Sequence, residues 1–288
     1  MLQPRSHVHR MIQDIAPHTY HNEYQPVRPD DTGILLVYQG RKILVNVESE
    51  QPVRTFSYPR VSDFPYIKKD ALRWLFREDM NHFFLCPEEL PEEKGFTYVS
   101  INFMRAAEPR FQAFAGVIGL SLAYWYKNHR FCGRCGKPLQ HGKTERMVYC
   151  PDCKTMLYPQ ICPAVIVAVR NGNKLLVSKY ANRHYTRMAL LAGYTEIGET
   201  IEQTVHREVM EEVGIKVKNL QFYKSQPWCF TDTLLFGFWC DLDGDDTLTV
   251  DTNELAMAQW VERENLPDDP EKASLTMEMM TLFKEGKM

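Results

Sequence analysis

The feature that most constrains this chain is the 23-residue segment 193–215, which reads GYTEIGETIEQTVHREVMEEVGI. Thr200 and Gln203 stand three residues apart, which is the spacing of a capping box at a helix N-terminus. Gly214 suits the left-handed conformation that ends many helices. Between these signals, aliphatic residues recur at every fourth position and form one apolar face, namely Ile201, Val205 and Val209. The segment therefore predicts a loop, then a helix that begins after Thr200 and ends at Gly214.

The other side of this predicted helix is acidic. Glu208, Glu211 and Glu212 stand three and four residues apart, so we expect their carboxylates to converge on one side. Clustered carboxylates repel one another unless a cation lies between them, and Mg²⁺ and Mn²⁺ prefer oxygen ligands and also bind phosphates. Arg207 lies eight residues after Glu199, and we expect the two to pair across the loop–helix junction. The alternative is a solvated acidic face, which is the usual role of a charge run.

The whole segment fits one pattern, G-x5-E-x7-R-E-U-x-E-E-x-G-U, where U is aliphatic, from Gly193 to Ile215. This pattern is the Nudix box, and the segment resembles that of the metal-dependent Nudix hydrolases, which cleave nucleoside diphosphates linked to another group. The match of every defined position favours catalysis over a solvated helix face. The resemblance implies that the catalytic residues are Glu199, Arg207, Glu208, Glu211 and Glu212.

Composition describes an ordinary globular protein, with 44% apolar and 25% charged residues. A net charge of −3 gives no support to broad binding of nucleic acid or of anionic membranes. The N-terminal residues lack the apolar core of a signal peptide, and no apolar run approaches the length of a membrane span. We therefore expect a cytoplasmic protein with no membrane partner.

Four of the eight cysteines form two C-x2-C pairs that are separated by fourteen residues. Paired knuckles of this kind let four thiolates reach one tetrahedral Zn²⁺, and turn-forming residues lie in both. With all four positions taken by sulfur, one structural zinc per chain is expected, bound by Cys132, Cys135, Cys150 and Cys153. Two disulfides are the alternative, but a reducing cytoplasm disfavours them. A ribbon of this type is also compatible with a contact module for nucleic acid or protein.

The pattern along the chain predicts an α+β fold in four parts: an N-terminal domain, a connecting helix, the zinc ribbon and the catalytic domain, over residues 1–108, 109–130, 131–160 and 161–288. Apolar–turn–apolar hairpins near Gly40 and Gly172 suggest that the N-terminal domain is a degenerate copy of the catalytic one, without a second box. Residues 69–80 are predicted to form a helix. Residues 87–93 are predicted to form a charged loop.

Around the box, the sequence predicts a sandwich in which helices enclose a mixed sheet. We expect a last helix over 273–284 and strands over residues 164–169, 174–180, 233–240 and 255–262. This arrangement is the α/β/α sandwich of a Nudix domain.

Ten residues beyond the box the chain reads SQPW, from Ser225 to Trp228. This element, together with the four-cysteine ribbon ahead of the box, resembles the NADH pyrophosphatase family of Nudix hydrolases. The resemblance implies hydrolysis of NAD(H) to AMP and nicotinamide mononucleotide, removal of NAD caps from RNA by some members, and a homodimer. It covers residues 110–262 by motif and the N-terminal third only by arrangement.

Residue by residue, the resemblance implies a catalytic metal, Mg²⁺ or Mn²⁺, held by Glu208, Glu212, Glu254 and the backbone of Ala192. It also implies a set of dinucleotide contacts that combines two ribbon residues, the SQPW loop and one residue of the last helix. These contacts would be Glu145, Tyr158, Gln226, Pro227, Trp228, Cys229, Phe230, Thr231, Asp232, Thr233 and Thr276. An aromatic side chain such as Trp228 can stack on adenine or nicotinamide, although a proline-turned loop with a core tryptophan is the alternative.

This sequence departs from the family pattern near the substrate. Cys229 and Thr231 replace two prolines, Thr233 replaces a serine, Gln160 replaces an arginine, and Thr276 replaces an alanine. Fewer prolines leave the loop less pre-organised, which puts the preferred dinucleotide in question. Two alternatives therefore stay open: a broader diphosphatase for ADP-ribose or other dinucleotides, and a zinc-ribbon RNA-binding or regulatory protein without turnover.

Overall fold

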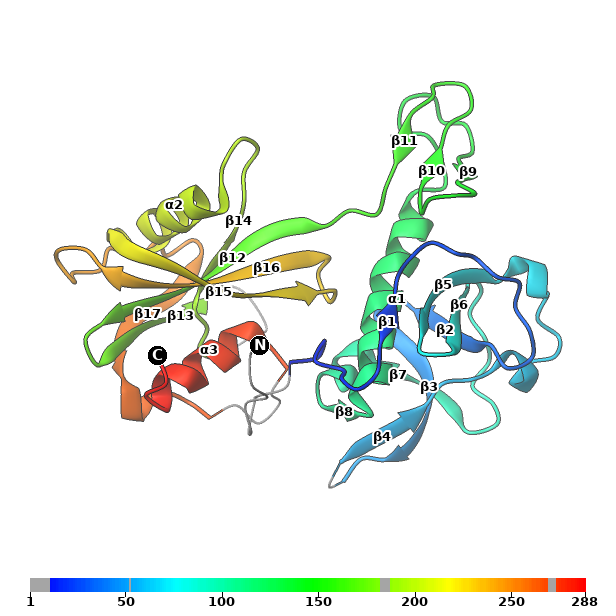
Figure 1. Cartoon of the computed structure of the whole chain (residues 1–288), viewed down its shortest axis with the longest axis horizontal. Helices are drawn as coiled ribbons and strands as arrows, with labels where there is room; N and C mark the ends of the chain where they lie inside the picture. Colours follow the sequence, from blue (N-terminus) through cyan, green and yellow to red (C-terminus); the bar gives the residue numbers. More distant parts are fainter. Residues whose placement is uncertain (1–10, 52, 182–186, 269–272) are drawn as a thin grey trace. The chain divides into compact units, whose positions relative to one another are not determined.

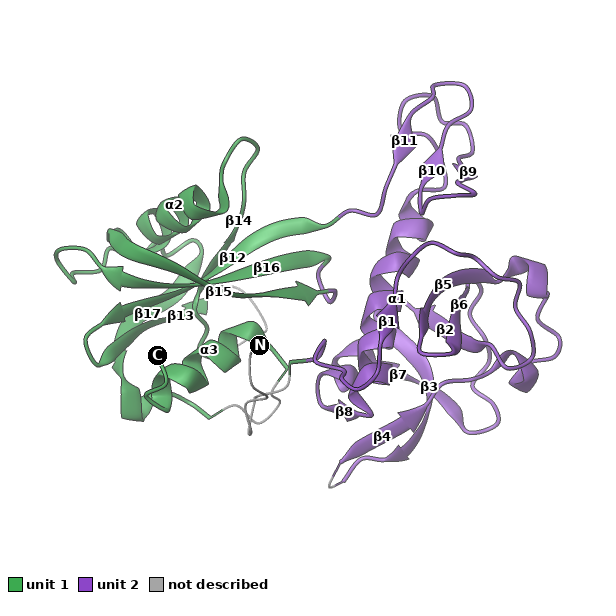
Figure 2. Cartoon of the chain, in the orientation of Figure 1, with its two compact units in different colours: residues 1–11, 161–228, 232–288 green, residues 12–160, 229–231 purple. Residues whose placement is uncertain are grey.

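The computed structural model describes residues 11–51, 53–181, 187–268 and 273–288. The chain divides into two compact units, drawn in two colours in Figure 2. Unit 1 comprises residues 1–11, 161–228 and 232–288, and unit 2 comprises residues 12–160 and 229–231. Figure 1 labels the helices and strands. Within the described residues, no helix is long and apolar enough to span a membrane.

Unit 1 is built on one mixed sheet. Its strands run in the order β15-β16-β12-β13-β17, and β14 pairs with β12 beside this row. Within the described residues of this sheet, β12 and β16 run parallel and the other pairs are antiparallel. The strands are β12 (Cys162–Asn171), β13 (Lys174–Tyr180), β14 (Leu191–Tyr194), β15 (Val217–Trp228), β16 (Thr233–Leu242) and β17 (Leu255–Glu262).

Helices α2 (Ile201–Val213) and α3 (Leu275–Lys284) lie on opposite sides of this sheet, as Figure 1 shows. Side chains of β12 alternate between the two faces, as the pleat of a strand requires. Val165 and Val167 belong to the core under α2, whereas Ile166 belongs to the core under α3. The predicted sandwich of a mixed sheet between helices is therefore confirmed.

The box helix has the ends that its sequence predicts. The Thr200 side chain accepts a hydrogen bond from the Gln203 backbone N–H, and the Gln203 side chain accepts one from the Thr200 N–H. Gly214 follows with a φ of 72°, in the left-handed region that favours glycine. The apolar residues Val205 and Val209 are fully buried against the sheet.

Unit 2 carries a second mixed sheet, followed by one long helix, α1 (Arg110–Asn128). Its central strand order, β5-β6-β2-β3 with β7 paired to β3, repeats the order β15-β16-β12-β13-β17 of unit 1. The middle pair, β2 with β6, is again parallel, and β4 also pairs in parallel with β8. The strands are β1 (Tyr20–His21), β2 (Ile34–Gln39), β3 (Lys42–Ser49), β4 (Arg54–Ser57), β5 (Arg73–Glu78), β6 (Asn81–Cys86), β7 (Phe96–Ser100) and β8 (Ala107–Glu108).

This repeated strand order supports the expectation of a duplicated fold. In unit 2 the described residues between β3 and β5 hold one short strand and two single 3₁₀ turns, Val61–Asp63 and Lys69–Ala71, where unit 1 has its box helix. The remaining 3₁₀ segments are Ile101–Arg105 and Arg263–Asn265. Helix α1 packs closely on the sheet: a side chain at Gly119 would bring its Cβ within 2.3 Å of Leu36.

The predicted helix over residues 69–80 is wrong. After the 3₁₀ turn Lys69–Ala71 the chain forms strand β5, which pairs with β6 on one side and β1 on the other. Trp74 and Phe76 are buried aromatic residues, a type that favours strands. Pairing with strands distant in sequence therefore overrides the local helical pattern.

The ribbon also belongs to unit 2 and forms a small three-stranded sheet of β9 (Gln140–His141), β10 (Val148–Tyr149) and β11 (Met156–Leu157). It is held to the larger sheet through Arg146. This guanidinium donates a hydrogen bond to the Leu75 carbonyl and lies 5.2 Å from the ring centroid of Tyr24. The ribbon is thus packed against the rest of unit 2 through polar and aromatic contacts.

Glu78 generates a prediction about stability. Its side chain on β5 is fully buried, and neither carboxylate oxygen has a hydrogen-bond partner within the described residues. Burial, and then the charge of Asp79, raises the pKa of Glu78 from 4.5 to about 8. Folding therefore takes up a proton between these two values, and the free energy of unfolding falls as pH rises through this window, by up to about 1.4 kcal/mol per pH unit.

We expect Glu78→Met to remove this slope and to raise the melting temperature most near the upper end of the window, because a methionine has no charge to desolvate. The exposed Glu88→Met is the control, with no change in slope expected. Thermal unfolding of the three proteins across the window measures the effect. A wild-type melting temperature that stays flat with pH would contradict the prediction.

Candidate metal and substrate sites

Arg207 on α2 is the centre of the box. Its Nε and Nη2 donate to the two carboxylate oxygens of Glu199 at 2.6 and 2.8 Å, which confirms the expected pair across the loop–helix junction. Nη2 also donates to the Tyr194 carbonyl at 2.9 Å, at the end of β14. Nη1 donates to Glu208 at 2.7 Å and to Glu211 at 2.9 Å. One guanidinium thereby joins the loop, the strand and two turns of the helix.

The Glu199 carboxylate fixes the loop ahead of the helix. Besides Arg207, it accepts hydrogen bonds from the Glu196 backbone N–H and the Thr204 hydroxyl, both at 3.0 Å. Hydrogen bonding to Arg207, and then to the Glu196 N–H, holds its pKa at about 2. Glu199 is therefore a permanent anion that organises the loop.

Glu208 lies against the strand that precedes the loop. A Cβ built on Gly193 of β14 would fall 1.9 Å from the Glu208 Cδ, so only glycine leaves room for this carboxylate. Burial raises the pKa of Glu208, while Arg207 lowers it and the charges of Glu211 and Glu254 raise it further. The required glycine of the box therefore has a direct steric explanation.

The other acidic residues of this region are Glu211, Glu212 and Glu254. Glu212 is buried on α2, and Glu211 and Glu254 are exposed. The loop before β17 is tied to the helix end, because the Asp251 N–H donates to the Glu212 carbonyl. Among the described residues, the four cysteines are the only group of three or more potential metal ligands whose ligand atoms all lie within 4.8 Å of one another, so the expected convergence of Glu208, Glu211 and Glu212 is incomplete. Arg207 accounts for this, since it draws Glu208 and Glu211 to its own guanidinium.

The donors of this region fit a hard divalent cation. Glu208, Glu212 and Glu254 offer only carboxylate oxygens, and Ala192, directly before Gly193 on β14, offers a carbonyl. Burial, and after it the charges of Glu211 and Glu254, raises the pKa of Glu208, and a cation bound among these carboxylates would relieve both effects.

The segment predicted as a substrate loop is shorter than expected. Gln226, Pro227 and Trp228 are the last residues of β15, and Trp228 pairs with Thr233, the first residue of β16. Only residues 229–232 form the turn, with Asp232 at a φ of 56°. Cys229–Thr231 group with unit 2. Trp228 is partly exposed, whereas Thr233 is buried and its hydroxyl lies 3.5 Å from the Tyr194 hydroxyl.

The side chain of Gln226 lies inside unit 1. Its side chain is 0% exposed, its Nε2 donates to the Ala273 carbonyl at 3.0 Å, and its Oε1 accepts from the Leu275 N–H at 2.7 Å. Both ends of the side-chain amide are thus bound at the start of α3, so this side chain does not reach the surface. Gln226 instead positions the first turn of α3, where the partly exposed Thr276 lies.

A second link between β15 and α3 was not anticipated from the sequence. The buried Glu278 carboxylate accepts hydrogen bonds from the Tyr223 hydroxyl and from Lys224 Nζ, the latter at 2.7 Å. An acidic residue inside the apolar run of residues 275–283 was the available signal, because a buried charge requires a partner.

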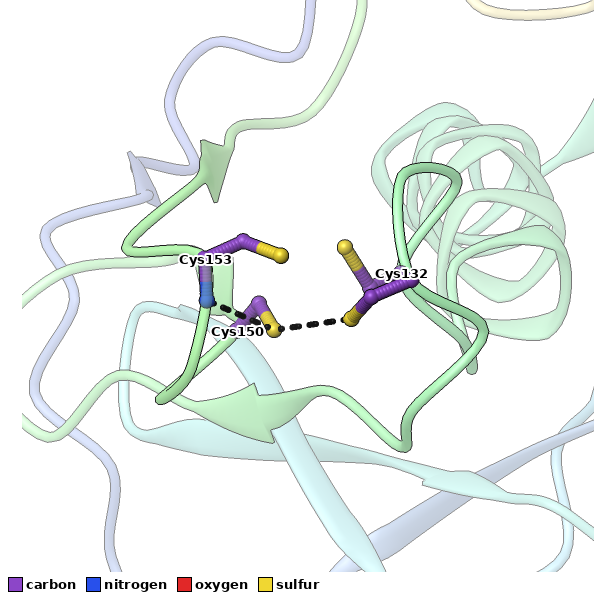
Figure 3. Close-up of side chains that lie close together, drawn as sticks. Cys132, Cys150 and Cys153 are labelled. Carbon is purple, nitrogen blue, oxygen red and sulfur yellow. Dashed lines mark hydrogen bonds between the residues drawn. The ribbon is translucent and has the colours of Figure 1, made fainter.

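The ribbon brings the four cysteines together, as Figure 3 shows for the knuckles that face one another. The Sγ atoms of Cys135 and Cys150 are 3.6 Å apart, close to the roughly 3.8 Å that a tetrahedral zinc site with 2.3 Å bonds requires. Both knuckles turn through a left-handed residue, Gly136 in one and Lys154 in the other. Four cysteine sulfurs in this arrangement fit a structural zinc ion.

The two ribbon residues expected near the dinucleotide lie together. The Tyr158 hydroxyl donates to Glu145 Oε2 at 2.8 Å, and this hydrogen bond raises the pKa of Tyr158. Both side chains are exposed.

A mixed sheet between two helices, with the box anchored through Arg207, defines a Nudix domain. A family model described as NUDIX domain matches residues 161–279, and one described as NADH pyrophosphatase zinc ribbon domain matches residues 127–158. Residues 127–279 thus combine a Nudix domain with a zinc ribbon of the NADH pyrophosphatase type.

Relatives include two proteins named NAD-capped RNA hydrolase NudC. That of Klebsiella pneumoniae (strain 342) is 45% identical over 150 residues, and that of Salmonella schwarzengrund (strain CVM19633) is 44% identical over 149 residues. Each match covers 52% of this chain and 58% of the relative. The chain thus spans little more than half the length of these relatives. A crystal structure of a NUDIX hydrolase from Nitrosomonas europaea matches with 21% identity and a TM-score of 0.45, over 54% of this chain and 91% of that one.

Zinc is predicted to be a folding element of the ribbon, because such a small module has little apolar core. We expect the wild type purified under reducing conditions to hold about one zinc per chain. Cys132→Ser with Cys135→Ser should abolish zinc binding and the hydrogen-exchange protection of β9–β11. Cys162→Ser, outside the cluster, is the control and should retain both. Disulfides without zinc in the reduced wild type would contradict the prediction.

Proposed function

We propose that this protein hydrolyses the pyrophosphate bond of NAD(H) to AMP and nicotinamide mononucleotide, and that it also removes NAD caps from RNA. The observation that carries the proposal is a complete Nudix box, organised by Arg207, in one chain with the NADH pyrophosphatase type of zinc ribbon. The similarity to relatives named NAD-capped RNA hydrolase supports NAD-capped RNA as a substrate.

The proposed division of labour follows from the residues. Glu208, Glu212, Glu254 and the Ala192 carbonyl would hold Mg²⁺ or Mn²⁺, which when bound supplies charge neutralisation to the pyrophosphate oxygens. A box carboxylate accepts the proton of the attacking water. The water oxygen bonds to one phosphorus, and the bond from that phosphorus to the bridging oxygen breaks. Arg207 acts by positioning Glu199 and Glu208 rather than by touching substrate.

Substrate selection is assigned to the turn between β15 and β16 and to α3. The partly exposed Trp228 offers a face on which adenine or nicotinamide can stack. Thr276 lies one residue after Leu275, which Gln226 holds, so the position of this threonine is fixed by a buried hydrogen bond. The ribbon pair of Glu145 and Tyr158 is proposed as a further polar contact to the dinucleotide.

A broader diphosphatase for ADP-ribose or other dinucleotides is the second candidate. The observation that favours it is the bulkier, polar Thr276 at the start of α3, where the family pattern has alanine. A regulatory RNA-binding protein without turnover is disfavoured, because a sensor does not need the full set of box carboxylates held by Arg207.

A substrate panel tests the proposal. The panel contains NADH, NAD⁺, NAD-capped RNA, ADP-ribose and FAD, each assayed with Mg²⁺ and with Mn²⁺. We expect the highest kcat/KM for one of the first three substrates. The products should be AMP and nicotinamide mononucleotide, identified by chromatography. A clear preference for ADP-ribose would establish the second candidate, and no turnover of any member would overturn the enzymatic proposal.

Glu212→Gln tests whether the box is the catalytic centre. Glutamine keeps the size of the buried side chain and removes one charge, so the variant should fold normally. We expect kcat to fall by at least ~10²-fold, the lower range for loss of one catalytic group. Glu202→Gln, in the exposed first turn of the same helix, is the matched control and should retain activity. Wild-type turnover by a folded Glu212→Gln enzyme would show that the reaction occurs elsewhere.

A further inference from the structure

Unit 2 contains a cavity of about 230 Å³ that has no part in the proposed reaction. Its walls come from three places that are far apart in the sequence: the segment before β2, Arg60, and the turn between β5 and β6 with the start of β6. All of these residues belong to unit 2. The volume is below the roughly 300–1,000 Å³ of pockets for drug-sized ligands, so the cavity fits a small ligand rather than a dinucleotide.

The cavity lies at the end of its sheet that corresponds to the proposed substrate end of the catalytic sheet. In unit 1, Trp228 and Thr233 flank the turn between β15 and β16, where the parallel strands β16 and β12 begin. In unit 2, the matching turn joins β5 to β6, where the parallel strands β6 and β2 begin. Met80 in this turn and Asn81, the first residue of β6, line the cavity.

Arg60 extends this correspondence to a second wall of the cavity. It forms an antiparallel bridge with Ile34, the first residue of β2. In unit 1, Tyr194 of β14 pairs in the same way with Ala164 near the start of β12, and the Tyr194 hydroxyl lies 3.5 Å from that of Thr233. The degenerate copy thus keeps a cavity at the substrate end of the fold, although it lacks the box helix.

Two arginines supply positive charge to the cavity. Arg28 is exposed and forms no hydrogen bond or ion pair with the described residues. Arg60 donates from Nη1 to the Thr32 carbonyl at 2.5 Å, and its other guanidinium nitrogens donate to no residue that the structure describes. Guanidinium groups with unused donors bind phosphate oxygens through paired hydrogen bonds, so these two side chains suit a phosphate.

His82 lines the same cavity and adds a neutral hydrogen-bond donor. Trp74 Nε1 donates to His82 Nδ1 at 3.1 Å, and an indole N–H only donates, so the imidazole proton is on Nε2. Burial, and then the charge of Arg77, lowers the pKa of His82, so the ring is neutral at pH 7. Because its Nε2–H group has no partner among the described residues, it is available to an oxygen atom of a ligand.

One anion and an apolar rim complete the lining. The hydroxyl and the backbone N–H of Thr32 donate to Asp30 Oδ1 at 2.7 and 2.9 Å, and these hydrogen bonds lower the pKa of Asp30. This carboxylate stays ionised and accepts hydrogen bonds from groups such as ribose hydroxyls. Met80 is 82% exposed and Val27 is 42% exposed, so both offer apolar surface to a planar ring. Two arginines against one aspartate give the lining a net charge of +1.

We propose that this cavity of unit 2 binds a nucleoside monophosphate, as a second ligand site separate from the box. Arg28 and Arg60 bind the phosphate. Asp30 accepts from the ribose hydroxyls, and the ring packs against Met80. The choice of ligand rests on the proposed function, because the substrate end of the sheet is defined only there. AMP and nicotinamide mononucleotide, the products of the proposed reaction, both carry the groups that these residues recognise.

Hydrogen exchange of the full-length, zinc-loaded protein locates binding without hydrolysis. Because a reaction product also binds at the box, the readout is restricted to peptides of unit 2 that cover residues 27–34, 58–62 and 79–84. The probes are AMP, nicotinamide mononucleotide, adenosine and inorganic phosphate, each titrated to about 5 mM, which fills a site with a Kd of about 1 mM. Arg28→Gln removes one phosphate contact. Arg54→Gln, exposed on β4 outside the cavity, is the matched control.

We expect one or both nucleotides to protect these peptides, and adenosine and phosphate to protect them less. Arg28→Gln should weaken nucleotide binding at least ~10-fold, because a hydrogen bond between charged groups is lost. Met80→Ala should weaken nucleotide binding by about 2- to 10-fold and leave phosphate binding unchanged. Arg54→Gln should match the wild type. The melting temperature of each variant shows that unit 2 remains folded.

Turnover separates this inference from the proposed function. Arg28→Gln should keep the wild-type kcat for NAD(H), because Arg28 is no part of the box. Failure of the wild type to hydrolyse NAD(H) would overturn the proposed function and leave the exchange result standing. The inference is overturned by no protection of the unit 2 peptides, by equal protection with adenosine or with phosphate alone, or by wild-type nucleotide affinity in Arg28→Gln.

Discussion

The structure of the box depends on one guanidinium. Arg207 uses Nε, Nη1 and Nη2 to join Glu199 in the loop, Glu208 and Glu211 on the helix, and the Tyr194 carbonyl on β14. Arginine suits this role because its donors form a rigid planar fork and its charge is permanent. A lysine would supply the charge without the fork. The strand, loop and helix therefore reach their mutual positions through a single side chain, and the carboxylates that can hold metal are placed as a consequence.

The two units show what the box adds to a common sheet. Both have a parallel middle pair and the same order of neighbouring strands. In unit 1 the space over one face is filled by α2, whose Val205 and Val209 complete the core. In unit 2 the corresponding described stretch contains a short strand and 3₁₀ turns, and it lacks the acidic helix. The sheet is therefore a scaffold that folds with or without a catalytic helix, and function resides in the inserted segment.

Structural features that depend on residues close together in the sequence could be predicted from it. Features that depend on contacts between residues far apart in the sequence could not. The ends of α2, the Glu199–Arg207 pair and the cysteine knuckles follow from local spacing, and the structure contains all three. Strand β5 was mistaken for a helix because its pairing with β1 and β6 is not visible locally. The burial of the Gln226 side chain is likewise not visible in the sequence, because it depends on hydrogen bonds to the start of α3.

The contacts that hold β15 in place affect how rigid the turn after Trp228 is, although this turn lacks two prolines of the family pattern. Prolines pre-organise a loop by restricting its unfolded conformations. Here the strand pairs with β16 up to Trp228 and Thr233, so only four residues remain outside the ladder. Gln226 also binds the strand to α3 through a buried hydrogen bond, and Lys224 does so through a partly buried one. Trp228 and Thr276 therefore lie next to residues that are hydrogen-bonded between β15 and α3. Pairing in the sheet thus provides part of the rigidity that the prolines would provide.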